Sequence, residues 1–283
     1  KRLTVLAGDP LTFQLPPYLA SLIVFEDRKG QGSLGKEFIT ALYNSLRPYG
    51  GTLCLENGGA KNIPLVKTLQ ELDLPGADVV ESQGFLLLRR EGPLPGAADW
   101  THQYGDIANT VKSDDRLVKL PLGLLWFGGS SNLDVLPRHG HGPPEQVVGG
   151  RLFIQGMDCF SARDVYTGRV LWTKPLPDLE NYGVYFDDTY RDAPLDTAYN
   201  QAHIPGANAR GTNFVAVEDR IYIIHGKSCL ALDPATGETR AEINLPSPVG
   251  SSEPPEWGYI GVYRDYLIAG ADFVRYSDFV KSA

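Results

Sequence analysis

Residues 162–172 read ARDVYTGRVLW, and residues 231–241 read ALDPATGETRA. The two stretches share Ala, Asp, Thr and Gly at the same spacing and lie 69 residues apart. The match continues upstream, because VGGRLFI at 148–154 lies over VEDRIYI at 217–223. In each copy a strand, a tight turn and a second strand lead into the shared stretch. This repeat predicts that one small β-sheet unit occurs at least twice.

A third, partial copy supports a particular architecture for these units. The stretch VYRDYLI at 262–268 begins 45 residues after the start of VEDRIYI. Short strands at even spacing fit a sandwich, a barrel or a propeller, and a repeat of about 40–50 residues with several strands per unit favours a propeller. The longer spacing of the first two copies then corresponds to one blade plus an insertion of about 25 residues, which falls within a segment at about residues 174–212.

The shared stretch also predicts how each unit is built. The Asp and Thr side chains can hydrogen-bond the backbone of the turn, Gly can take a positive φ, and the small Ala lets neighbouring sheets approach. Trp172 can cover the gap to the next blade, and Trp126 is likewise expected to be a core aromatic between blades. The structural residues predicted in this way are Ala162, Asp164, Thr167, Gly168, Trp172, Ala231, Asp233, Thr236 and Gly237.

Residues 162–172 resemble the tryptophan-docking repeat of quinoprotein-type (PQQ-like) β-propellers, Ala-x-Asp-x-x-Thr-Gly-x-x-x-Trp, at every fixed position. The second copy departs from that pattern because Ala241 stands where Trp is expected. The resemblance covers roughly residues 99–283 and implies an all-β, incomplete ring of about three blades. The family includes quinone-dependent alcohol dehydrogenases, which use PQQ with Ca²⁺, and non-enzymatic scaffold proteins of the bacterial envelope. It therefore implies a location in the bacterial periplasm or cell envelope.

Composition changes near residue 95. Residues 1–94 carry as many basic as acidic side chains, so the net charge of −8 lies in the remainder, together with all five His and all four Trp. The segment Glu91–Gly96 (EGPLPG) is a cluster of helix and strand breakers. We therefore predict two domains, 1–94 and 95–283.

The first part alternates strand and helix signals, which predicts an α/β unit with a mostly parallel sheet. Strands are expected at Leu3–Leu6, Ser21–Phe25 and Thr52–Glu56, helices at Lys36–Leu46 and Ile63–Leu72, and a terminal hairpin at Asp78–Glu81 and Phe85–Arg90.

This part resembles the C-terminal half of a class I, Rossmann-like methyltransferase that uses S-adenosylmethionine (SAM). The resemblance rests on Gly8-Asp9, on the strand that ends in LIV at 22–24, and on the turn LRPYGG at 46–51. It implies that Gly8 and Asp9 lie on the adenine side of bound SAM, and that the last strand of the hairpin is reversed. The glycine-rich loop and the acidic ribose ligand of that family would come before residue 1. We therefore expect this chain to be a piece of a longer, multidomain polypeptide.

Other candidate sites have weaker support in the sequence. The loop GQGSLGK at 30–36 lacks the Ser or Thr of a Walker loop and reads as a strand-to-helix connection. His139 and His141 could chelate a metal, but no third ligand stands close to them. The insertion is rich in Tyr and Asp, which suits either a polar ligand or contact with another module. The negative charge disfavours nucleic acid as a partner, and the longest apolar runs are too short for a membrane span.

Three functions remain open at this stage. The first is a binding or scaffold module built on the propeller, with a protein partner or the remaining blades of a longer chain beside it. The second is a PQQ-dependent dehydrogenase; its family often has a disulfide between adjacent cysteines, whereas Cys54, Cys159 and Cys229 are far apart. The third is a SAM-dependent methyltransferase that is completed by sequence outside this chain.

Overall fold

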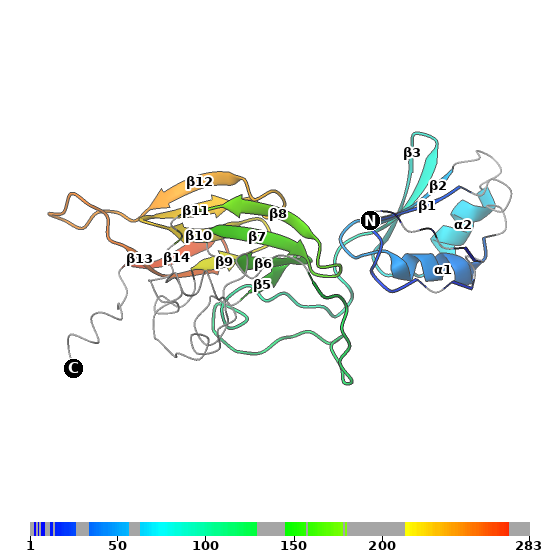
Figure 1. The fold of residues 1–283 in the computed structure, drawn as a ribbon, viewed down its shortest axis with the longest axis horizontal. Helices are drawn as coiled ribbons and strands as arrows, with labels where there is room; N and C mark the ends of the chain where they lie inside the picture. The colour runs from blue at the N-terminus through cyan, green and yellow to red at the C-terminus, as the bar shows by residue number, and fades with distance from the viewer. Residues whose placement is uncertain are drawn as a thin grey trace. The chain divides into compact units, whose positions relative to one another are not determined.

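The computed structural model divides the chain into two compact units, Lys1–Ala97 and Ala98–Ala283, and each is described by itself (Figure 1). No helix in the described part of the chain is both long and apolar enough to cross a membrane. The structure describes residues 3, 5, 7–8, 12–13, 15–26, 34–56, 63–128, 145–156, 158–177, 179 and 213–271.

The first unit is a mixed four-stranded sheet with two helices. Strands β1 and β2 are parallel, whereas β4 is antiparallel to both β2 and β3. The expected hairpin forms, and β4 folds back between β2 and β3 to give the order β1-β2-β4-β3, so that among the described strands β1, β2 and β3 run in one direction and β4 runs opposite to them. The elements are β1 (Leu22–Phe25), α1 (Lys36–Ser45), β2 (Gly51–Glu56), α2 (Ile63–Glu71), β3 (Ala77–Ser82) and β4 (Phe85–Arg90).

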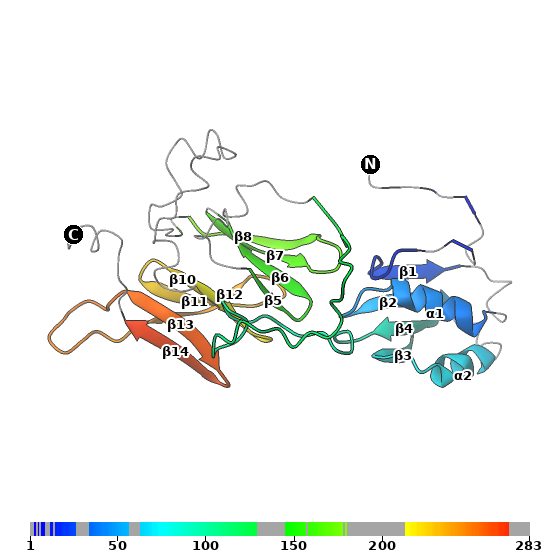
Figure 2. The ribbon, with the colours of Figure 1, turned by 90° about the horizontal axis from the view of Figure 1, so that it is seen from below.

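Both helices pack against the same face of this sheet (Figure 2). Side chains alternate between the two faces of a strand, so Leu53 and Leu55 of β2 point with Leu86 and Leu88 of β4 toward the helices. The helices add apolar side chains at helical spacing to the same cluster. The members of this core that are almost fully buried are Ile39, Tyr43, Leu46, Leu53, Leu55, Leu69, Leu86 and Leu88.

Arg90 fixes the end of α1 to the sheet. Its side chain is buried, and Nη1 donates to the carbonyl oxygens of Tyr43 at 3.3 Å and of Leu46 at 3.1 Å. The guanidinium also lies over the rings of Tyr18 and Tyr43, with its carbon 5.2 and 5.0 Å from the ring centroids. A cation at the C-terminus of a helix satisfies carbonyl groups that have no partner within the helix and interacts favourably with the helix dipole.

Arg90→Met should therefore lower the free energy of unfolding of the first unit by about 2–3 kcal/mol, the typical contribution of a hydrogen bond to a charged group. All four tryptophans lie beyond residue 97, so tryptophan fluorescence reports on the second unit, while both described helices lie in the first. In urea, the helical circular dichroism signal should be lost at lower denaturant in Arg90→Met than in the wild-type chain. An unchanged midpoint of this signal would contradict the role of Arg90.

The described residues of the second unit form three antiparallel sheets. We call the first two blade A, with strand order β5-β6-β7-β8, and blade B, with order β9-β10-β11-β12, and we call the β13-β14 pair blade C. Each four-stranded sheet pairs every strand with its neighbour in sequence. The strands are β5 (Gln146–Val148), β6 (Arg151–Gln155), β7 (Cys159–Asp164), β8 (Val170–Pro175), β9 (Phe214–Ala216), β10 (Ile221–His225), β11 (Ser228–Leu232), β12 (Thr239–Asn244), β13 (Trp257–Tyr263) and β14 (Tyr266–Ala271).

Blade B lies between the other two sheets. Its strand β9 lies beside both β5 of blade A and β13 of blade C. One apolar core fills the space between blades A and B and contains Phe153, Phe160 and Phe214, and a second core between blades B and C contains Tyr222, Trp257 and Ile260. The β-rich second unit thus stacks its sheets face to face, with one buried apolar layer between each neighbouring pair.

Candidate functional site

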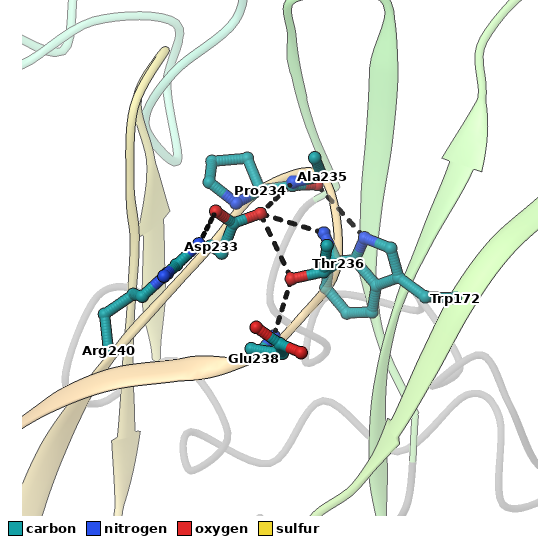
Figure 3. Close-up of polar contacts among 7 residues, drawn as sticks. All are labelled: Trp172, Asp233, Pro234, Ala235, Thr236, Glu238 and Arg240. Carbon is teal, nitrogen blue, oxygen red and sulfur yellow. Dashed lines mark hydrogen bonds and ion pairs between the residues drawn. The ribbon is translucent and has the colours of Figure 1, made fainter.

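The turn after β11 is held by one aspartate. Oδ1 of Asp233 accepts hydrogen bonds from the backbone N–H of Ala235 at 2.8 Å and of Thr236 at 2.9 Å, and from Oγ1 of Thr236 at 3.2 Å (Figure 3). Oγ1 of Thr236 in turn accepts from the backbone N–H of Glu238. These four contacts hold the turn through its own residues, without a contribution from another blade.

Blade A contains the same turn at the matching repeat position. Oδ1 of Asp164 accepts from the backbone N–H of Tyr166 and of Thr167, both at 3.0 Å, and from Oγ1 of Thr167 at 3.1 Å. Gly168 and Gly237 have φ values of +69° and +74°, a backbone region that favours glycine. The hydrogen bonds and the glycine conformation are those expected from the repeat.

Trp172 of blade A docks on the turn of blade B. Its Nε1 donates to the carbonyl oxygen of Pro234 at 3.0 Å (Figure 3). Its ring lies so close to Gly237 that a Cβ atom added there would be 2.7 Å from ring carbon Cε3. Glycine is therefore required at this position for two reasons, which are its positive φ and the lack of room for a Cβ atom beside the indole ring.

Trp126 makes the same contact with blade A. Its Nε1 donates to the carbonyl oxygen of Val165 at 2.8 Å, and a Cβ atom added at Gly168 would be 2.3 Å from its ring. Val165 and Gly168 occupy the repeat positions of Pro234 and Gly237. Trp126 was expected between blades, but its equivalence to Trp172 was missed, because no Ala-x-Asp-x-x-Thr-Gly stretch precedes it.

The second copy differs at the docking position. Ala241 lies on β12 with its side chain exposed, so the docking contact that the repeat would make from this position is missing. Instead, Arg240 donates from Nη2 to Oδ2 of Asp233 at 2.7 Å. This hydrogen bond, with those from the turn, lowers the pKa of Asp233 from 3.8 to about 2.

Polar side chains also join blades A and B, and sequence reasoning missed them. The buried amide of Gln146 donates from Nε2 to the carbonyl oxygen of Phe214 and accepts at Oε1 from the N–H of Ala216, both at 2.7 Å. Asn213 donates from Nδ2 to Oε1 of Gln155 at 3.3 Å. Gln146 thus pairs with the backbone of β9 as a neighbouring strand would, a role that residue type alone does not indicate.

A segment before blade A, Asp99–Ile107, connects blade A to blade C. Trp100 and Val147 exchange two backbone hydrogen bonds, and Oδ1 of Asp99 accepts from the N–H of Gly149 in blade A. Burial raises the pKa of Asp99, and the nearby carboxylate of Glu218 in blade B raises it further. Ile107 contacts Gly261 of blade C so closely that an added Cβ would be 2.4 Å away. We name Asp99–Ile107 the linking segment.

His102 is the buried polar contact of the linking segment with blade C. Its Nε2 accepts a hydrogen bond from the backbone N–H of Val262 at 3.0 Å, and its Nδ1 lies 2.7 Å from Oγ1 of Thr101. A nitrogen that accepts from an N–H cannot carry a proton, so this contact requires the neutral ring with its proton on Nδ1, which then donates to Oγ1 of Thr101. Burial lowers the pKa of His102 below 6.5, opposed by the carboxylate of Asp106.

The remaining predicted site residues are not brought together by the described structure. Gly8 has open space around it. Asp9, His139, His141 and residues 180–212 of the insertion lie outside the described residues. Within the described ranges, no group of three or more His, Cys, Asp or Glu side chains is placed to hold a metal ion.

No family model and no curated protein sequence matches the chain significantly. Among solved structures, the quinohemoprotein alcohol dehydrogenase of Comamonas testosteroni is similar at 20% identity and a TM-score of 0.37 over 62% of this chain and 23% of its own. A europium-containing methanol dehydrogenase is similar at 17% identity and a TM-score of 0.39 over 62% of this chain and 28% of its own. BamB from Moraxella catarrhalis is similar at 16% identity and a TM-score of 0.26 over 45% of this chain and 33% of its own. The chain thus spans about a quarter to a third of the length of these proteins.

Gly237→Ala should destabilise the second unit much more than Gly226→Ala. Both glycines have positive φ, at +74° and +60°, so each substitution carries the strain of about 1 kcal/mol that left-handed backbone imposes on alanine. Gly226 has no heavy atom within 4 Å of an added Cβ, whereas Gly237 faces the ring of Trp172. Overpacking should therefore cost Gly237→Ala about 1–3 kcal/mol more, measured by urea unfolding followed by tryptophan fluorescence. Equal losses would mean that the indole does not dock there.

Acid should weaken the second unit through His102. Because the pKa of His102 is lowered in the fold, the unfolded chain binds more protons as the pH falls. The stability that the neutral ring contributes is therefore complete above about pH 6.5 and is lost as the pH drops below that value. His102→Gln, which can still accept from Val262, should flatten this dependence between about pH 8 and about pH 5. His225→Gln, in β10, is the matched control and should keep it. Thermal midpoints across the pH series provide the measurement, and an unchanged slope in His102→Gln would contradict the assignment.

Proposed function

We propose that the second unit is a segment of a quinoprotein-like β-propeller that serves as a binding or scaffold module within a larger multidomain protein. The observation that carries this proposal is the repeated docking of an indole, Trp126 on Val165 and Trp172 on Pro234. The same contact at the same repeat position joins the Trp126 segment to blade A and blade A to blade B. This is the property of a solenoid or ring in which each unit contacts its neighbours.

The described residues do not fit a quinone site. A PQQ-dependent dehydrogenase would need oxygen ligands for Ca²⁺, and no three His, Cys, Asp or Glu side chains converge within the described ranges. None of Cys54, Cys159 and Cys229 forms a disulfide. We therefore derive no catalytic step through PQQ or Ca²⁺. At the blade interfaces, the described polar side chains of Gln146, Asn213 and His102 form hydrogen bonds with backbone groups or with other side chains.

A methyltransferase is the second candidate, and one observation favours it. In the first unit the reversed strand β4 lies between β2 and β3, and β1 and β2 are parallel. A reversed strand in this hairpin supports the candidate, because the resemblance of residues 1–94 implies one. Gly8 is described on the chain that leads to β1, while Asp9 lies outside the described residues. The described part thus offers one residue toward a SAM site, and we derive no methyl-transfer step from it.

The proposed partners are the further blades and domains of a longer chain, or a separate protein. We also propose a location in the bacterial periplasm or cell envelope, which rests on the propeller resemblance alone.

The scaffold proposal is tested by reconstitution. The purified chain is incubated with PQQ and Ca²⁺, and alcohol-dependent reduction of a redox dye is measured; calorimetry with SAM is run in parallel. A scaffold module should show neither dye reduction nor heat of binding. Dye reduction that needs both PQQ and an alcohol would overturn the proposal in favour of the dehydrogenase. Saturable SAM binding that is lost in Gly8→Val would instead support the second candidate for the first unit.

A further inference from the structure

The linking segment is attached to blade C by a side-chain hydrogen bond and an apolar contact. Nε2 of His102 accepts from the backbone N–H of Val262 at 3.0 Å, and the side chain of Ile107 covers Gly261 so closely that no Cβ atom would fit there. Blades A and B, by contrast, share a large core of buried apolar side chains. Elements with few buried contacts open at a lower free energy than those that share a large core. The linking segment can therefore detach from blade C while blades A and B stay stacked.

The hydrogen bonds around His102 determine which ring nitrogen carries the proton. Oγ1 of Thr101 donates to the carbonyl oxygen of Gly105 at 3.4 Å, which leaves this oxygen to accept from Nδ1–H of His102, 2.7 Å away. Nε2 must then be unprotonated in order to accept from Val262. A proton added to Nε2 would place two N–H groups against each other. The hydrogen bond to blade C therefore exists only while His102 is neutral.

The charged groups around His102 favour detachment once the ring is protonated. Within the linking segment the carboxylate of Asp106 acts on the ring, and on the side of blade C the backbone N–H of Val262 does. Arg264 and Asp265, one of each sign, follow at the exposed tip of the β13–β14 hairpin. Asp106 accepts from the N–H and Oγ1 of Thr110, which keep its pKa below 3.8. Asp106 is thus an anion wherever His102 titrates, and it stabilises the imidazolium.

A second titratable group anchors the linking segment to blade A. Oδ1 of Asp99 accepts from the N–H of Gly149, and burial raises the pKa of Asp99, as does the carboxylate of Glu218 in blade B. A protonated carboxyl keeps an oxygen that can accept from Gly149, so acid does not in itself break this anchor. The two backbone hydrogen bonds between Trp100 and Val147 do not involve a titratable group. The attachment to blade A therefore persists under conditions that break the hydrogen bond to blade C.

We propose that His102 is a pH-dependent switch, in which a proton taken up from solvent at Nε2 detaches residues 101–107 from blade C while Asp99 and Trp100 stay on blade A. Detachment exposes the backbone N–H of Val262 at the edge of β13 and uncovers Gly261. The acid form of the chain thus has a free strand edge that the neutral form covers. This switch goes beyond the proposed scaffold function and does not depend on it, so the two proposals can fail separately.

Hydrogen exchange of the Val262 amide tests the switch. Protection factors, which are corrected for the pH dependence of intrinsic exchange, are measured by NMR at pH 7.5 and pH 5 for Val262 and for Ile223 of blade B. The factor of Val262 should fall at least about tenfold relative to that of Ile223, because the open form binds the proton more tightly and gains up to tenfold in population per pH unit. Unchanged protection of Val262, or an equal fall at Ile223, would overturn the proposal.

His102→Gln separates the switch from a general effect of acid. The amide oxygen of glutamine can accept from Val262 at either pH, so the protection of Val262 should be the same at pH 7.5 and pH 5. Asp99→Asn is the matched control, because it keeps an acceptor for Gly149 but removes the other titrating group, and it should retain the wild-type pH dependence. Loss of the dependence in Asp99→Asn would assign the switch to Asp99 and overturn the proposal.

The protonation state of the ring provides a readout that needs no variant to fold. Nitrogen-15 spectra of His102 in the wild-type chain should show the Nδ1–H tautomer at pH 7.5, and both nitrogens should become protonated as Val262 loses its protection. A proton on Nε2 at pH 7.5 would contradict the hydrogen bond from Val262 and, with it, the switch.

Discussion

The second unit depends on the distance between an indole ring and a glycine in the next blade. Trp172 can donate to Pro234 only because Gly237 has no side chain and takes a positive φ. The aspartate and threonine of the turn hold that glycine in place through hydrogen bonds within five residues. A local turn motif thereby sets a long-range spacing, and the apolar layers between blades are filled to match it.

Much of the fold follows from the sequence because its signals are local. The repeat at 162–172 and 231–241 gave the turns, the inter-blade position of Trp172 and the loss of docking at Ala241. Hydrophobic periodicity gave α1, α2 and the terminal hairpin to within a few residues. The position of β4 between β2 and β3 was not predicted, because it depends on which strands pair, and pairing between distant strands leaves little trace in one sequence.

The site could be predicted only in part, for the same physical reason. Gln146, Asn213 and His102 act through backbone groups of distant strands, with Val262 lying 160 residues from His102. An amide or imidazole that bonds to backbone needs no complementary side chain, so no residue pattern reveals its partner. Trp126 was expected at an interface, but its docking on Val165 could not be predicted, since no recognisable copy of the repeat precedes it in the sequence.

The linking segment has a consequence for the order in which the molecule assembles. It is the first part of its unit to leave the ribosome, and its contacts with Val262 and Gly261 belong to the last sheet described. Closing so long a stretch of chain costs entropy before any contact is gained, and folding slows as contacts become less local. Blades A and B can stack, and Trp100 can pair with Val147 of blade A, while synthesis continues, but the linking segment completes its contacts, through His102 and Ile107, only when blade C is available. Until then its apolar side chains remain open to the chaperones that attend a nascent chain.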